Sequence, residues 1–273
     1  MTAPQPTSGN RPPRPTLVCL HGFMGRGADW RGVAAALGDA FDCHLPDLPG
    51  HDGHLPPWLW AGADFATYCQ GAWEALSPGL PQRFVLAGYS MGGRIAAALA
   101  LRHPERIAAL VLEGAHPGLE NPTARRERRQ QDAVWARRFE HDPWPDLLED
   151  WYRQPVFGDL DTTTRRRFIA ARAVHDPRAL ARVLEAASLA DQPDLRPGLA
   201  ALAVPVFFIA GDRDTRFTAL GEDLAARCPG ITLVKLQGLG HNCHAQAPEA
   251  VAGVLARAAR AARTEAIHPD ENP

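Results

Sequence analysis

The chain has 273 residues, of which 45% are hydrophobic and 22% are charged, a composition that suits a globular protein with a sizeable core. Its formal net charge of -2 at pH 7 gives no overall attraction to nucleic acid or anionic lipid, so we expect neither as a partner. The five cysteines are widely spaced and include no C-x-x-C pair, so we expect reduced thiols, no disulfide framework and no metal site.

The first residues, 1–15, are polar and rich in proline, without the apolar run of a signal peptide. We therefore expect a disordered tail at 1–15 and a cytoplasmic protein. A second polar tail is expected at 265–273. Nowhere is the sequence apolar over the length that a membrane span needs, and we expect no association with a membrane.

Short apolar runs alternate with amphipathic segments after the first tail, which predicts an α/β protein with a mostly parallel sheet flanked by helices. The predicted strands cover residues 16–20, 41–45, 83–88, 107–113, 204–210 and 231–236. The predicted helices that alternate with them cover residues 29–37, 63–76, 92–103, 217–227 and 248–263.

The alternation stops between residue 116 and about residue 197, where no run is typical of a strand. Helical periodicity in this stretch covers residues 125–139, 147–152, 162–173 and 177–189. Such an insertion predicts a helical cap, or lid, over the carboxyl edge of the sheet, where open α/β sheets bind their ligands. We therefore divide the chain into a core domain of two parts, 16–115 and 199–264, and a cap at 116–198.

The sequence GYSMG at residues 88–92 joins a predicted strand to a predicted helix. A G-x-S-x-G pattern in this context predicts a sharp turn that exposes a serine hydroxyl. The glycines have a steric role, because strand and helix backbones nearly touch at such a turn. Ser90 is therefore the candidate nucleophile or base.

A serine hydroxyl becomes reactive when an imidazole accepts its proton and a carboxylate orients that imidazole. Two acids, Asp212 and Asp214, follow the predicted strand 204–210, and the residues themselves leave both open. Two histidines, His241 and His244, follow the last predicted strand. His241 comes directly after a glycine, and we prefer it; His244 is interpreted as a structural histidine.

The sequence LHGFM at residues 20–24 follows the first predicted strand and is typical of a loop that binds a negative oxygen. The backbone N–H of Phe23 can join that of Met91 to form an oxyanion hole. Met91 also opens a predicted helix, whose dipole favours negative charge there. We interpret His21 as an orienting residue and the turn at 47–51 as architectural.

Several segments together carry a resemblance to a known family. They are LHGFMG at 20–25 with the following Asp29-Trp30, GYSMGGR at 88–94, LEGAHPGL at 112–119 and WYRQPVF at 151–157. With them the chain resembles the α/β-hydrolase superfamily and, more narrowly, the MenH family of 2-succinyl-6-hydroxy-2,4-cyclohexadiene-1-carboxylate synthases. One departure is PGHDG at 49–53, where that family usually has glycine directly after the histidine.

The resemblance implies a lyase of menaquinone biosynthesis with an α/β-hydrolase fold. Its reaction eliminates pyruvate from 2-succinyl-5-enolpyruvyl-6-hydroxy-3-cyclohexene-1-carboxylate, begins with abstraction of a ring proton, and needs no metal or organic cofactor. By resemblance, Ser90, Asp214 and His241 form the triad, which assigns Asp214 rather than Asp212. The Phe23 and Met91 amides would hold the developing enolate oxygen.

The substrate that the resemblance implies is a small polycarboxylate, so the pocket should be rich in fixed cations. The resemblance assigns this role to Arg94, Arg128 and Arg172, whose guanidinium groups can bind carboxylates through two hydrogen bonds each. Tyr89 and Trp151 would line the same pocket. We expect a monomer or a weak homo-oligomer.

Two other functions fit part of the pattern. A serine hydrolase of esters or carbon–carbon bonds would use the same triad, with Ser90 as a nucleophile. A non-catalytic ligand-binding module on this fold is the other alternative, and the complete triad argues against it. The arginines separate the lyase from an esterase, because an esterase pocket should be mostly apolar.

Overall fold

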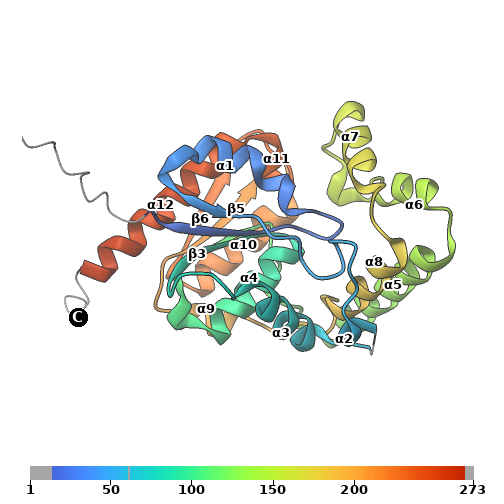
Figure 1. Cartoon of the computed structure of the whole chain (residues 1–273), viewed down its shortest axis with the longest axis horizontal. Helices are drawn as coiled ribbons and strands as arrows, with labels where there is room; N and C mark the ends of the chain where they lie inside the picture. Colours follow the sequence, from blue (N-terminus) through green and yellow to red (C-terminus); the bar gives the residue numbers. More distant parts are fainter. Residues whose placement is uncertain (1–13, 61, 268–273) are drawn as a thin grey trace, which may run out of the picture.

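A parallel sheet of six strands lies at the centre of the structure, a computed structural model that describes residues 14–60 and 62–267 (Figure 1). The strand order is β2-β1-β3-β4-β5-β6, and every pair of neighbours is parallel. The strands are β1 (Thr16–Leu20), β2 (Asp42–His44), β3 (Phe84–Tyr89), β4 (Ile107–Glu113), β5 (Val206–Gly211) and β6 (Ile231–Leu236). The predicted α/β class with a parallel sheet is confirmed, and each predicted strand end lies within two residues of the observed one.

The strand order reverses between β1 and β3. From β1 the chain first adds β2 on one side and then builds β3 to β6 on the other. Leu20, the last residue of β1, is the register partner of Gly88 near the end of β3. Ligands of open α/β sheets bind outside the carboxyl ends of the strands at such a switch point, so the loops after β1 and β3 meet where a site is expected.

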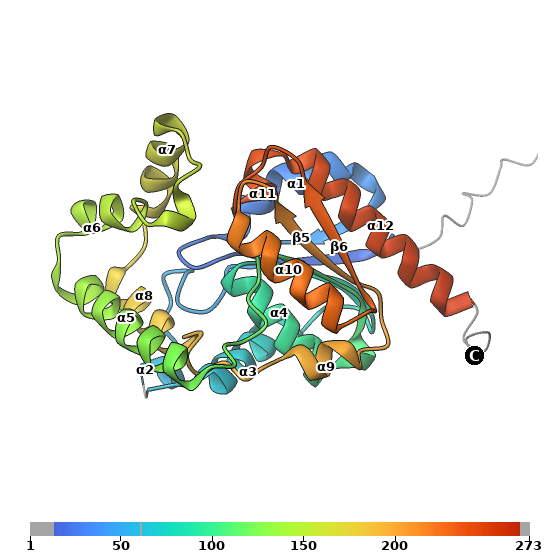
Figure 2. The ribbon, with the colours of Figure 1, turned by 180° about the vertical axis from the view of Figure 1, so that it is seen from behind.

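Helices cover both faces of the sheet (Figures 1 and 2). Along β1, Leu17 and Cys19 pack in one apolar cluster and Val18 and Leu20 in another, as the two-residue period of a strand requires. The first cluster includes buried residues of α1 (Arg31–Leu37) and α12 (Pro248–Ile267). The second includes residues of α3 (Phe65–Leu76), α4 (Met91–Arg102), α9 (Arg196–Ala200) and α10 (Thr215–Arg227).

Four helices between β4 and β5 form the cap, which lies at one end of the sheet in Figures 1 and 2. They are α5 (Pro122–His141), α6 (Trp144–Trp151), α7 (Thr162–Arg172) and α8 (Pro177–Ala186). The cap residues Phe139, Leu148 and Leu180 belong to a third apolar cluster, which also includes Met24 of the loop after β1. The predicted helical insertion is therefore present, while its division from the core at 116 and 198 stays a prediction.

Small differences from the predicted elements have local reasons. The short helices α2 (Pro57–Trp60), α9 and α11 (Cys243–Gln246) were not predicted, because one turn is too short to show a helical period. Helix α8 ends at Ala186 rather than near residue 189. Helix α12 runs through Ile267, so residues 265–267 of the second predicted tail are helical, in keeping with the helix-forming residues there.

The predicted tails otherwise lie largely outside the described residues, which exclude 1–13 and 268–273. Within the described ranges no helix is both long enough and apolar enough to cross a membrane. The same ranges hold no group of three or more His, Cys, Asp or Glu side chains placed to bind a metal ion.

Candidate active site

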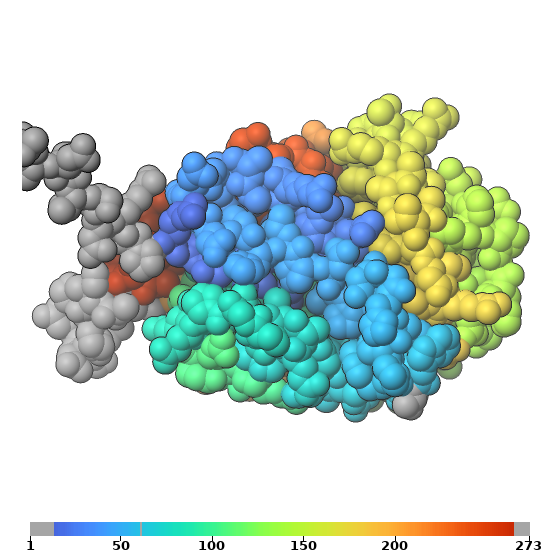
Figure 3. Space-filling model, in the orientation of Figure 1, coloured from blue at the N-terminus to red at the C-terminus, as the bar shows by residue number. Residues whose placement is uncertain are grey.

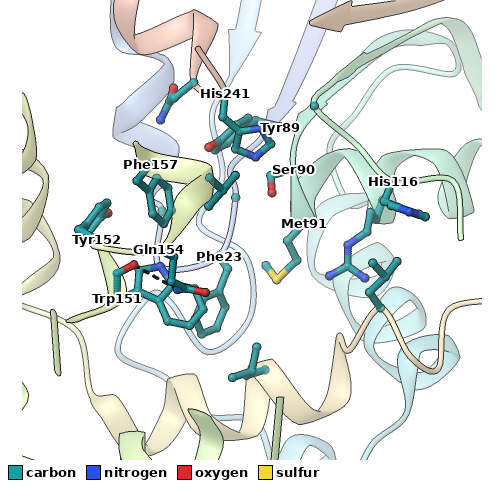
Figure 4. A pocket seen from close by; sticks show the side chains of 18 of the residues that line it. Phe23, Tyr89, Ser90, Met91, His116, Trp151, Tyr152, Gln154, Phe157 and His241 are labelled. Carbon is teal, nitrogen blue, oxygen red and sulfur yellow. Dashed lines mark hydrogen bonds between the residues drawn. The ribbon is translucent and has the colours of Figure 1, made fainter. Parts of the chain in front are cut away.

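Ser90 occupies the turn between β3 and α4 with a φ of 51°, in the left-handed region that residues other than glycine rarely adopt. This conformation costs about 1–3 kcal/mol, so the surroundings must hold it. The Ser90 N–H donates to the carbonyl of Glu113 at 2.8 Å, and the Ser90 carbonyl accepts from the Arg94 N–H at 3.0 Å. The turn lies at the cavity, and Figure 4 shows the Ser90 hydroxyl there.

The glycines around Ser90 allow three backbones to approach closely. A Cβ on Gly88 would overlap the backbone of Gly92, and a Cβ on Gly92 would overlap the backbone of Leu20 and His21. A Cβ on Gly22 would lie 2.8 Å from the Tyr89 ring. The G-x-S-x-G pattern thus brings the loop after β1 against the start of α4, as the steric argument from the sequence predicts.

His241 and Asp214 form a close pair beside this turn. His241 Nδ1 lies 2.6 Å from Asp214 Oδ2, and the two side chains are 5% and 10% exposed. Asp214 is also the N-cap of α10, where its Oδ1 accepts from the Phe217 N–H at 3.2 Å. Because the carboxylate accepts the proton on Nδ1, Nε2 of a neutral His241 is left as a proton acceptor. In Figure 4 the His241 ring and the Ser90 hydroxyl face the same cavity.

The other acid and the other histidine lie in different surroundings. Asp212 is exposed, and its Oδ1 accepts from the Gly238 N–H at 2.8 Å in the loop after β6. His244 Nδ1 lies 3.0 Å from Glu113 Oε1, with both side chains 1% exposed. Its ring stacks on Trp30 at 4.2 Å. The geometry therefore places His241 and Asp214 together and keeps Asp212 and His244 in structural contacts.

The loop after β1 is fixed by His21. Its Nε2 accepts from the Leu48 N–H at 2.9 Å, so its Nδ1 carries the proton and donates to the Gly22 carbonyl at 2.8 Å. Burial lowers the pKa of His21 to about 4, which keeps the ring neutral near pH 7. Asp47 accepts from the Gly27 N–H at 2.6 Å. These contacts agree with an orienting role for His21 and an architectural turn at 47–51.

A cavity of about 310 Å³ lies between the carboxyl edge of the sheet and the cap. Of the predicted site residues, all but Asp214 line it, and Asp214 lies behind His241. Those that line it are Phe23, Tyr89, Ser90, Met91, Arg94, Arg128, Trp151, Arg172 and His241. Figure 4 shows Phe23 and Trp151 on the cap side of the cavity and Met91 below Ser90.

Several polar lining residues were not predicted from the sequence. They include Asp29, His116, Asp132, Gln154, Arg216 and Asn242. Asp29, His116 and Gln154 belong to segments that carry the family resemblance, which was the available signal for them. Arg216 follows Asp214 on the same turn, and no sequence pattern distinguishes it from the chain's other arginines.

The guanidinium group of Arg94 contacts the segment that follows α8. Nη2 donates to the Ala187 carbonyl at 2.7 Å, and Nη1 donates to Gln192 Oε1 at 3.1 Å. The side chain is buried, and burial together with the charge of Arg128 lowers the pKa of Arg94 to about 10. Arg94 is therefore still a cation near pH 7.

The two predicted cap arginines each hold a carboxylate of the protein. Arg172 donates from Nη1 and Nη2 to the two oxygens of Asp29, at 2.9 and 2.7 Å. Burial alone would raise the pKa of Asp29, but the charge and hydrogen bonds of Arg172 outweigh it, and the pKa is lowered. Arg128 donates from Nε to both oxygens of Asp132, at 2.8 and 2.9 Å.

His116 lies near several positively charged arginines at one end of the cavity. Its Nδ1 accepts from the Gly118 N–H at 3.0 Å. Burial lowers the pKa of His116 to about 3, helped by Arg216, Arg196, Arg94 and Arg128 in that order. Three of these arginines, Arg94, Arg128 and Arg216, line the cavity together with His116. Their positive charges favour an anionic ligand at this end of the cavity.

Comparison with known proteins agrees with this geometry. The family model described as alpha/beta hydrolase fold matches residues 15–248. A 2-succinyl-6-hydroxy-2,4-cyclohexadiene-1-carboxylate synthase of Salmonella newport (strain SL254) is 40% identical over 250 residues, which cover 92% of this chain and 96% of that protein. The chain belongs to the α/β-hydrolase family and, within it, to the family of these synthases. The enzyme of the same name from Salmonella agona (strain SL483) is 39% identical over the same coverage.

Solved structures show the same fold for this α/β-hydrolase. MenH from S. aureus has a TM-score of 0.84 at 23% identity, over 94% of this chain and 97% of that one. A hydrolase from Pseudomonas aeruginosa PA01 has a TM-score of 0.72 at 26% identity, over 89% of each chain. The family resemblance and the α/β-hydrolase fold expected from the sequence are thus confirmed, and the chain is an enzyme of this type.

Proposed function

We propose that this enzyme eliminates pyruvate from 2-succinyl-5-enolpyruvyl-6-hydroxy-3-cyclohexene-1-carboxylate, which gives 2-succinyl-6-hydroxy-2,4-cyclohexadiene-1-carboxylate in menaquinone biosynthesis. The observation that carries the proposal is that Ser90 and His241 line the same cavity as three arginines, Arg94, Arg128 and Arg172. A serine and histidine set alone fits many reactions. The arginines select a substrate with several carboxylates, and the name of the relatives agrees with that choice.

The first step is a proton transfer. Ser90 takes the ring proton next to the succinyl ketone and passes its own proton to His241 Nε2, while Asp214 stabilises the imidazolium that forms. The electrons of the broken C–H bond move onto the ketone oxygen. The backbone N–H groups of Phe23 and Met91 donate to the resulting enolate, a kind of stabilisation that is usually the largest single contribution to catalysis.

The second step is the departure of pyruvate. The enolate electrons return to form a C2=C3 bond, the C3=C4 bond of the ring shifts to C4=C5, and the C–O bond between C5 and the enolpyruvyl group breaks. The leaving group takes the proton held by His241 and tautomerises from its enol to pyruvate, which restores Ser90 and His241. The sequence of steps forms no acyl-enzyme and requires no metal or organic cofactor, because proton transfer and stabilisation of the enolate are enough to break the C–O bond.

The arginines bind and orient the substrate in this proposal. Arg128 uses Nε for Asp132, which leaves its Nη groups for a substrate carboxylate. Arg172 binds Asp29 through both Nη groups, while its Nε has no hydrogen-bond partner among the described residues, so a substrate carboxylate shares this guanidinium group with Asp29. Tyr89 and Trp151 supply the apolar walls. We further propose a monomer or weak homo-oligomer in the cytoplasm that needs no nucleic-acid or membrane partner.

The test is the product. The purified enzyme should release pyruvate from the enolpyruvyl substrate, measured with a coupled lactate dehydrogenase, and should turn over simple aryl esters poorly. Ser90→Ala is the matched control and should release almost no pyruvate. Rapid ester hydrolysis without pyruvate would contradict the lyase and support a serine hydrolase, since that reaction would use the same triad.

A further inference from the structure

Met24, which follows the proposed oxyanion residue Phe23, has a φ of 58° and a fully buried side chain. A residue other than glycine adopts this conformation only where its surroundings hold it. Two histidines contact its backbone. The Met24 N–H donates to His51 Nε2 at 3.2 Å, and the Met24 carbonyl accepts from His175 Nε2 at 2.9 Å.

The two hydrogen bonds fix the proton positions of both rings. A backbone N–H can only donate, so Nε2 of His51 accepts and its proton sits on Nδ1, an atom that is buried without a hydrogen-bond partner among the described residues. A carbonyl can only accept, so Nε2 of His175 carries a proton. Burial lowers the pKa of His51 well below its usual range, and the neighbouring His21 and His175 lower it further. The ring therefore stays neutral, and its Nε2 remains a hydrogen-bond acceptor.

The histidines come from different parts of the molecule. His51 lies in the turn that follows β2 in the core. His175 lies between α7 and α8 of the cap, where its N–H donates to the Arg172 carbonyl at 3.1 Å. Figure 3 shows this yellow part of the cap packed against the blue part of the core. The backbone of Met24 is therefore held from both sides of the core–cap boundary.

The side chains of the same loop pack into the cap. Met24 belongs to the third apolar cluster, together with Phe139 and Leu148 of the cap. The ring of Phe23 lies 5.6 Å from that of Phe139 and 5.1 Å from that of Trp151. Seating of the cap and the conformation of residues 23 and 24 are thus linked through backbone and side chains alike.

We propose that His51 and His175 are positioning residues that clamp Met24, so that the preceding Phe23 N–H points at the enolate oxygen only when the cap is seated. The inference rests on the proposed function, which assigns the Phe23 amide to that oxygen. It adds a source of transition-state stabilisation that comes from the cap. His51 and His175 act through the peptide, and neither is required to touch the substrate.

The clamp is tested by His51→Ala and His175→Ala, with His51→Gln and His175→Gln as rescues, because a glutamine amide can supply an acceptor or a donor where Nε2 lies. His141→Ala, at an exposed histidine of α5, is the control. Each alanine variant should lower kcat for pyruvate release by roughly 10- to 100-fold and change KM by less than about twofold, as loss of oxyanion geometry would. The glutamine variants should recover most of kcat.

A second readout does not depend on activity. Backbone hydrogen exchange of the peptide that spans residues 22–27 should become faster in both alanine variants than in the wild type and His141→Ala. The clamp would be overturned if the alanine variants had the kcat and the hydrogen-exchange rate of the wild type. It would also be overturned if kcat fell only in proportion to the fraction of folded protein and the glutamine variants did not recover it. If the wild type released no pyruvate, the proposed function would fail, and the exchange measurement would still decide the clamp.

Discussion

The carboxyl edge of the sheet and the cap contribute to the same cavity in different ways. At the edge, His241 and Asp214 contact each other beside a turn that holds Ser90 in one conformation. In the cap, Arg128 and Arg172 are paired with carboxylates of the protein itself. The edge is organised before a ligand arrives, whereas Arg172 must share its charge between Asp29 and the ligand. We therefore expect changes at the edge to lower kcat and changes in the cap arginines to raise KM.

The largest effect is expected at the edge. Asp214→Asn should lower kcat on the order of 10³-fold or more, because the asparagine cannot stabilise the imidazolium or fix its tautomer. Asp212→Asn should stay within about twofold of the wild type, since an asparagine oxygen can still accept from the Gly238 N–H. Steady-state pyruvate release measures both. If Asp212→Asn lowered kcat more than Asp214→Asn did, Asp212 and not Asp214 would be the acid of the triad.

The next effect is expected at Arg172. Lysine cannot reproduce the two parallel hydrogen bonds of a guanidinium, so Arg172→Lys should raise KM about 10-fold or more while kcat changes little. Arg166→Lys, at an exposed position of the same helix, is the control. A fall in kcat with no change in KM would show that Arg172 acts on the reaction rather than on binding.

A smaller effect is expected at Arg128, which is about one third exposed and so is partly screened by solvent. Arg128→Ala should raise KM by about 3- to 10-fold, and would also lower kcat if its contact strengthens in the transition state. Arg126→Ala, at an exposed position of α5, is the matched control. An unchanged kcat/KM would assign Arg128 to a solvated helix face with no part in substrate binding.

The smallest expected effect on activity is that of His21, whose buried neutral ring acts on stability. The folded pKa of His21 is about 4, below the unfolded value of about 6.5, so the unfolded chain binds more protons between these pH values. Stability therefore rises with pH over this window and falls as the pH drops from about 6.5 to 4. In urea unfolding, His21→Gln should flatten the slope by up to about 1.4 kcal/mol per pH unit. An unchanged slope would contradict a neutral His21.

The sequence predicts the sheet well because most strands are short, largely apolar runs, such as 107–113, whose ends coincide with those of β4. The one-turn helices α2, α9 and α11 were not predicted, because one turn is too short to show a helical repeat of apolar residues. Ser90 and His241 follow from their places after strands. The choice between Asp212 and Asp214 does not, because both follow β5, and only the contact of Asp214 with His241 and its capping of α10 separate them.

The contacts of the cap could not be predicted from local patterns. Arg172 and Asp29 are 143 residues apart in the chain and meet only when the cap packs on the core. The same holds for His175 and Met24, which are 151 residues apart. Arg216 lines the cavity from a position that looks like any exposed arginine in the sequence. Which partner each of these side chains binds is decided by residues far away in the chain, and the periodicity of the sequence does not show these pairs.

The most direct test of the account compares two reactions on one preparation of the enzyme. kcat/KM is measured for pyruvate release from 2-succinyl-5-enolpyruvyl-6-hydroxy-3-cyclohexene-1-carboxylate and for hydrolysis of an aryl ester, with Ser90→Ala as the blank for both. We expect the elimination to have by far the larger kcat/KM, with the activity lost in Ser90→Ala. A larger kcat/KM for the ester, without release of pyruvate, would contradict the central claim.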